Sequence, residues 1–104
     1  MISFDQTEFI LGPVKYGDTK IVTVNVFNNS SEIVTLSTAN SSCSCTTGSL
    51  EATKLLPNGK TKFKISLNSL KAGKGLNQVK TIQLKYDLNR QQHSQVFRLK
   101  VNVV

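Results

Sequence analysis

The chain has 104 residues, close to the commonest size of one domain, so we expect a single domain over residues 1–104 with one hydrophobic core. No stretch approaches the roughly 18 consecutive apolar residues of a membrane-spanning helix, and we therefore expect no membrane partner. The first residues show no signal-peptide pattern. The expected location is therefore a virion or the cytoplasm, with export to the periplasm as the alternative.

The formal net charge of +7 is distributed unevenly along the chain. Residues 1–52 hold two basic and five acidic side chains, a net charge of −3, whereas residues 53–104 hold eleven basic and one acidic, a net charge of +10. Such polarity suits an acidic partner surface, nucleic acid or a head-to-tail contact between copies. A solvated basic face without any partner is the remaining alternative.

The first half of the chain predicts strands separated by turns. Residues 9–11 precede Gly12-Pro13, a break typical of an edge strand that kinks. In residues 20–27 apolar and polar side chains alternate, which predicts a half-buried strand. Another strand is expected at residues 33–38, ahead of a stretch rich in Ser, Cys and Thr at residues 41–49.

The second half continues the pattern after a turn signal at residues 57–59. Strands with strict alternation are expected at residues 62–67, 81–86 and 97–103, with a hairpin connection at residues 88–92. No segment has a convincing helical period. The predicted fold is therefore all-β, an immunoglobulin-like sandwich of about seven antiparallel strands.

Four motifs resemble a known family across nearly the whole chain. They are Phe9-Ile10-Leu11-Gly12 with the following turn, residues 24–29, Ser42-Cys43-Ser44-Cys45-Thr46, and residues 56–60. Together they resemble the DUF1573 group of bacterial immunoglobulin-like domains, whose architecture is related to major sperm protein and the ASPM–SPD-2–Hydin modules. The resemblance implies the same sandwich and assigns no function. Ser44 departs from the family pattern, which has Gly between the cysteines.

Cys43 and Cys45 are the first place to look for chemistry, because positions i and i+2 of a strand face the same side. They are either small apolar thiols packed in or beside the core, or partners in a disulfide. A metal or redox site is the weaker alternative, because zinc needs at least three protein ligands and only His93 could join the cysteines. We expect no metal and no cofactor.

The sequence offers no catalytic constellation. His93 stands alone in a polar hairpin region, and the six carboxylates show no paired spacing for acid–base chemistry. No glycine-rich loop precedes a helix that could hold a phosphate. We therefore expect that the protein is not an enzyme.

A basic face is the better candidate for function. On each of the predicted late strands the polar side carries Lys or Arg, and if these strands were neighbours their charges would form one stripe. The candidate partner-binding residues are Lys60, Lys62, Lys64, Lys85, Arg98 and Lys100.

The pattern argues against nucleic acid as a ligand of this face, because single-strand binders interleave aromatic side chains with charge. Phe63, Tyr86 and Phe97 instead share the side of the apolar residues. An acidic protein surface fits better, and self-association through exposed edge strands is a further option.

The expected function is that of an accessory subunit that docks onto a larger assembly, such as an auxiliary or decoration protein on a bacteriophage capsid. The alternatives are a cellular or exported protein-binding domain of the DUF1573 type and, from another class, a nucleic-acid-binding protein.

Overall fold

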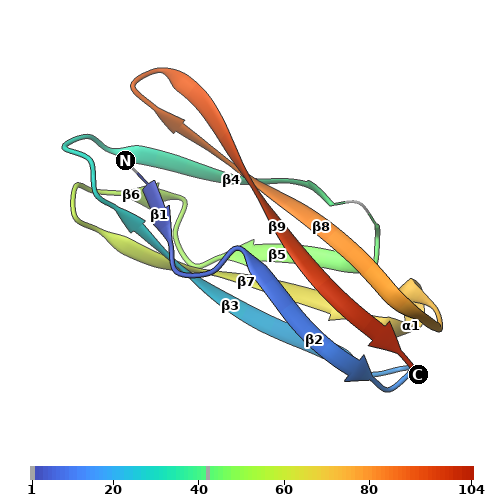
Figure 1. Ribbon diagram of the computed structural model, residues 1–104. Coiled ribbons are helices and arrows are strands. Elements are labelled where there is room, and N and C mark those ends of the chain that lie inside the picture. Colours follow the sequence, from blue (N-terminus) through green and yellow to red (C-terminus); the bar gives the residue numbers. More distant parts are fainter. Residues whose placement is uncertain (1, 42) are drawn as a thin grey trace.

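The computed structural model describes residues 2–41 and 43–104, which form two β-sheets packed face to face (Figure 1). The sandwich confirms the predicted all-β immunoglobulin-like fold. Its elements in chain order are β1 (Ile2–Phe4), β2 (Glu8–Val14), β3 (Thr19–Asn28), β4 (Val34–Ser41), β5 (Thr46–Leu50), β6 (Lys54–Leu55), β7 (Lys60–Asn68), α1 (Ser69–Ala72), β8 (Gly75–Leu88) and β9 (Gln91–Val103).

One sheet has the strand order β1-β3-β7-β5 and the other the order β2-β9-β8-β4-β6. Nine strands are described in place of about seven, because short strands such as β1 and β6 carry too few residues to show a period. The pair β2–β9 is parallel, whereas antiparallel pairing was expected throughout. The parallel pair arises because the chain leaves β1 in the first sheet and enters β2 at the edge of the second.

The core lies between the sheets, where the predicted alternation places apolar side chains. The rings of Phe63 and Phe97, from opposite sheets, lie 5.4 Å apart at its centre and are fully buried. A second buried cluster lies toward the α1 end of the sandwich and contains Cys45, Leu67 and Val103. The edge strand β2 kinks at the predicted place, with a register shift between Ile10 and Gly12.

The one-turn helix α1 was not predicted from the sequence. The Asn68 side chain accepts hydrogen bonds from the amides of Leu70 and Lys71, and Gly73 ends the turn with a φ of 80°. A helix of four residues is too short to show a 3.6-residue period, so the pattern could not reveal it.

The predicted hairpin between β8 and β9 is present, with Asn89 and Arg90 at positive φ in a two-residue turn. The described residues extend over 46 × 19 × 19 Å, so the sandwich is long and narrow. Within residues 2–41 and 43–104, no helix is long and apolar enough to cross a membrane.

Candidate protein-binding surface

Strand β7 presents a row of lysines on the outer surface of the first sheet. Its residues alternate strictly, so that Phe63, Ile65 and Leu67 enter the core while the intervening side chains are exposed or partly exposed. Lys60, Lys62 and Lys64 therefore project from the same side of one strand. The structure brings these three predicted residues together.

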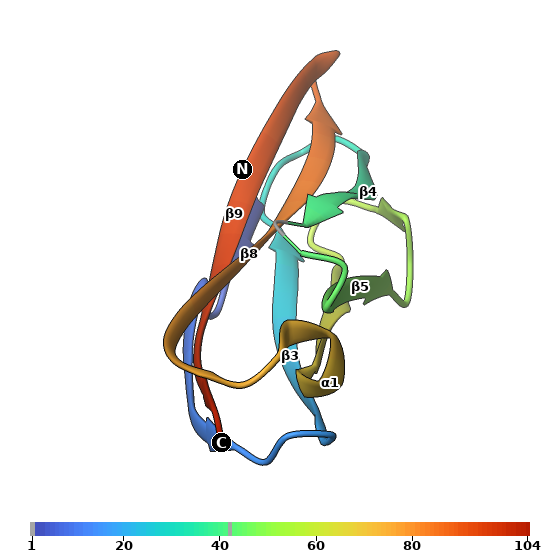
Figure 2. The same cartoon turned by 90° about the vertical axis from the view of Figure 1, so that its right-hand side faces the viewer.

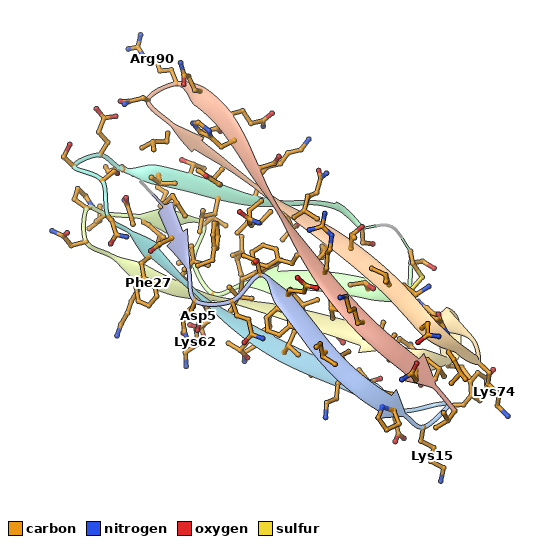
Figure 3. The ribbon with its side chains drawn as sticks, in the orientation of Figure 1. Asp5, Lys15, Phe27, Lys62, Lys74 and Arg90 are labelled. Carbon is orange, nitrogen blue, oxygen red and sulfur yellow. A yellow bond between two sulfur atoms is a disulfide. The ribbon has the colours of Figure 1, made fainter. Side chains whose placement is uncertain are left out.

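Strand β3 places an aromatic ring beside this row. In the antiparallel register Phe27 lies opposite Lys60, and Asn25 lies opposite Lys62. The two strands border a hollow of about 330 Å³, lined by Asn25, Phe27, Glu51, Lys60, Thr61 and Lys62. Figure 3 shows the side chains of Phe27 and Lys62 on the same side of the ribbon. We call Phe27, Lys60, Lys62 and Lys64 the β7 lysine face.

The lysines of this face keep their charge available. Nearby Asp5 is engaged with Asn25, whose backbone amide donates to one carboxylate oxygen over 2.9 Å and whose side-chain amide donates to the other over 2.8 Å. In the described parts of the chain, none of the three lysines forms an ion pair with a carboxylate. The face thus carries three positive charges along one strand, with the partly exposed ring of Phe27 beside Lys60 and Lys62.

The other three predicted residues lie on the opposite side of the molecule. Lys85 belongs to β8, and Arg98 and Lys100 belong to β9, so all three are in the second sheet. The expected single stripe of six charges is wrong. The physical reason is the strand order: β7 pairs with β3 and β5, whereas β8 and β9 pair with each other across the sandwich.

Part of the charge on this second side is neutralised. The Lys100 ammonium lies 2.9 Å from the Glu8 carboxylate, on the neighbouring strand β2. A hydrogen bond and charge attraction from Lys100, with a smaller contribution from Arg98, lower the pKa of Glu8. Beside the pair, a hollow of about 260 Å³ is lined partly by the apolar side chains of Ile10 and Val79.

Cys43 and Cys45 are joined by a disulfide in the connection between β4 and β5. The structure therefore has the disulfide, and the alternative of two packed thiols is wrong. Burial was expected for either alternative, and Cys45 is buried with Leu67 and Val103 in the second core cluster. Among the described residues, no group of three or more His, Cys, Asp or Glu side chains could hold a metal ion.

His93 lies on β9 and is exposed, with its ring stacked on that of Tyr86 at 5.2 Å between centroids. This contact gives the imidazole a packing role at the hairpin that was expected there. Neither thiol of the cysteine pair is free to serve as a nucleophile.

Phe27 is the residue of the β7 lysine face that the sequence analysis missed. Its position in β3 has the same parity as Thr23 and Asn25, which the alternation places on the polar side. The alternation of β3 could therefore have identified Phe27, because an aromatic side chain on the polar side of a strand is unusual and often marks a contact.

The architecture defines a class of immunoglobulin-like sandwich domains that includes PapD-like and major-sperm-protein domains. The ASH/PapD-like domain 7 of human CEP192 superposes with a TM-score of 0.72 at 13% identity, over 99% of this chain and 84% of that one. A protein of unknown function from Porphyromonas gingivalis W83 superposes with a TM-score of 0.76 at 16% identity, over 98% of this chain and 46% of that one. WR4, a C. elegans MSP family member, superposes with a TM-score of 0.63 at 13% identity, over 100% of this chain and 98% of that one.

At these identities the superpositions show the fold alone. The profile of the DUF1573 family, described as a protein of unknown function, matches residues 2–103. The chain belongs to the DUF1573 family, as its motifs suggested. No curated protein matches its sequence.

Proposed function

We propose that this domain is a non-enzymatic binding module that docks through the β7 lysine face onto an acidic segment of a partner protein. The observation that carries the proposal is the hollow in which Lys60 and Lys62 flank the partly exposed ring of Phe27. Interfaces use such a ring as an anchor and the surrounding charges to orient the partner.

A carboxylate-rich chain with an apolar side chain has the matching chemistry. Its carboxylates would pair with the three ammonium groups, and its apolar side chain would enter the hollow beside Phe27. The proposal extends to a larger assembly that displays an acidic surface, with a bacteriophage capsid as the specific case expected from the sequence.

The test compares two triple variants that remove the same charge. In one variant Lys60, Lys62 and Lys64 become Gln, and in the matched control Lys85, Arg98 and Lys100 become Gln. Binding of a fluorescent glutamate-rich peptide that contains one leucine is followed by anisotropy. We expect the first variant to bind about tenfold more weakly, since three exposed charges each contribute a few tenths to one kcal/mol. Equal weakening by both variants would show that only net charge matters and would contradict the proposal.

A nucleic-acid ligand is the second candidate, and one observation favours it. Phe27 is an aromatic ring on the charged side of its sheet, where a base could stack between lysines. An oligonucleotide held by the three lysines would lose affinity with salt, with a slope of about −2 in log–log coordinates. Phe27→Leu would separate the candidates, because leucine keeps an apolar anchor for a peptide but removes the stacking surface for a base.

The Cys43–Cys45 disulfide supports the alternative that this binding domain is exported, because disulfides persist in oxidising compartments. Titration of thiols in denaturant, on protein taken from its native source, tests this point. We expect no free thiol. Two free thiols per chain would support the cytoplasmic or virion location expected from the sequence.

A further inference from the structure

One end of the sandwich is built from segments that lie far apart in the sequence. The hydroxyl of Ser69, at the start of α1, accepts a hydrogen bond from the Gly17 amide over 2.8 Å and donates to the Asp18 carbonyl over 2.6 Å. This fully buried serine fastens the connection between β2 and β3 to the helix. Figure 2 shows both segments in the lower part of the view, close to the start of β8. This end of the sandwich, formed by the β2–β3 connection, α1 and the start of β8, is called the platform below.

Three large apolar side chains project from this platform. Tyr16 in the β2–β3 connection is 41% exposed, Leu70 in α1 is 56% exposed, and Leu76 at the start of β8 is 69% exposed. Single exposed apolar residues need no explanation, but three large ones on segments at the same end of a small domain point to a contact there.

The same segments carry an excess of positive charge. Residues 15–20 and 69–76 contain four lysines and one carboxylate, that of Asp18. The Lys74 ammonium lies 5.4 Å from the centroid of the Tyr16 ring. Figure 3 shows Lys15 and Lys74 directed away from the body at this end. We call Lys15, Tyr16, Leu70, Lys71, Lys74 and Leu76 the basic tip.

We infer that the basic tip docks onto an anionic lipid surface. A bilayer interface takes up protruding Leu and Tyr side chains without a complementary groove, and its anionic headgroups attract the lysines beside them. A partner protein would instead need a shape that fits around three separate projections. Charge complementarity and the protruding apolar side chains thus favour the lipid surface.

This inference is independent of the β7 lysine face, which is formed by other residues. It also goes beyond the expectation of no membrane partner, which rested on the lack of a spanning segment. A peripheral contact through exposed side chains needs no such segment. With a long axis of 46 Å, the domain would stand with the basic tip on the lipid and its sheets above it.

The first experiment is co-sedimentation with vesicles, using phosphatidylcholine alone and phosphatidylcholine mixed with phosphatidylglycerol. We expect binding to the mixed vesicles alone. Replacing Lys15, Lys71 and Lys74 with Gln should lower the partition coefficient about 100-fold, because each lysine near an anionic surface contributes about fivefold. The matched control is the variant in which Lys60, Lys62 and Lys64 become Gln, and it should keep most of the binding.

The second experiment uses the absence of tryptophan from the chain. Leu70→Trp creates a single tryptophan on the basic tip, and Ile33→Trp places one at the opposite end, where the native side chain is equally exposed at 55%. On addition of mixed vesicles, the emission of Leu70→Trp should shift to shorter wavelength, and that of Ile33→Trp should stay unchanged. Circular dichroism of each variant without vesicles checks that it is folded.

Three outcomes would overturn the inference. They are failure of the folded wild-type protein to bind mixed vesicles, equal loss of binding in the two triple lysine variants, and equal emission shifts in the two tryptophan variants. If the tip variant instead loses binding to the glutamate-rich peptide while vesicle binding is unchanged, the basic tip is a protein contact and the lipid assignment is wrong. Failure to bind vesicles and equal emission shifts leave the proposal for the β7 lysine face untouched, because neither measurement involves its residues.

Discussion

At the scale of single residues, Asn28 has the largest number of side-chain hydrogen bonds in the described chain segments. Its side-chain amide nitrogen donates to the carbonyls of Glu32, Leu55 and Leu56, and its side-chain oxygen accepts from Ser30. The residue is fully buried at the end of β3. Asn28 therefore joins the β3–β4 connection to the β6–β7 connection, at the end of the molecule opposite the basic tip.

Asn28→Asp should destabilise the domain by about 3 kcal/mol or more, because a buried carboxylate would face three carbonyl oxygens without a donor between them. The loss of stability should become smaller as the pH falls, since protonation of the new aspartate removes its charge. Urea unfolding at neutral and acidic pH measures both effects. Asn29→Asp, at the exposed neighbouring position, is the control and should cost little; equal losses would contradict the role given to Asn28.

The Glu8–Lys100 pair leads to a prediction about pH. Because Lys100 lowers the pKa of Glu8 in the folded state, the pair stabilises the fold above the unfolded-state pKa of Glu8. That contribution is lost as the pH falls through the lowered folded-state pKa. In Lys100→Gln the Glu8 carboxyl should titrate closer to its ordinary value, as measured by carbon NMR. An unchanged titration curve would show that Lys100 is not the cause.

At the scale of elements, β5 packs unusually close to the core. A Cβ atom added at Gly48 would lie 2.5 Å from Cε1 of Phe63 and 3.0 Å from Cδ1 of Ile82. Phe63 is itself on the paired strand β7, opposite Leu50 and two residues before Ile65, which lies opposite Gly48. The glycine therefore lets the edge strand β5 cover the ring of Phe63.

Gly48→Ala should cost about 1–3 kcal/mol, because an added methyl group overpacks this site. The loss should be smaller in a Phe63→Leu background, which opens space beside the new methyl group. Thermal or urea unfolding of the four proteins in this double-mutant cycle measures the coupling. Ser49→Ala, at the exposed next position, is expected to change stability by less than about 0.5 kcal/mol. Additive effects of the two core changes would contradict the close approach.

At the scale of the whole molecule, charge is divided among separate surfaces. The β7 lysine face lies on one sheet, the partly neutralised residues Arg98 and Lys100 on the other, and the basic tip at one end. If both proposals hold, the domain contacts a protein through the β7 lysine face and a lipid surface through the basic tip at the same time.

If the domain is a subunit of a larger assembly, untagged protein from its native source should sediment at constant stoichiometry with a large particle in a density gradient. Mass spectrometry across the fractions would identify the components. Replacement of Lys60, Lys62 and Lys64 by Gln should release the domain, because the contact depends on those charges. Sedimentation of the wild type as a free chain would rule out the assembly form of the proposal.

Much of the fold could be predicted because strand periodicity is a local property. Phe63, Ile65 and Leu67 alternate with Lys62 and Lys64, and this pattern alone predicts a strand with one buried and one charged side. The same rule locates the polar side of β3, where Phe27 lies. The sequence could thus predict that the side chains of the β7 lysine face lie on the polar sides of their strands. It could not predict that β3 pairs with β7 and brings Phe27 beside the lysines.

The sequence by itself determined which side is buried in the strands that alternate strictly, since the burial of apolar area favours each apolar side chain individually. Only the tertiary structure decided that Lys64 and Lys85 lie on opposite sheets and that Lys15, Leu70 and Lys74 meet at one end. Strand order depends on contacts between distant segments, which are selected by the packing of the whole core and leave no local period in the sequence.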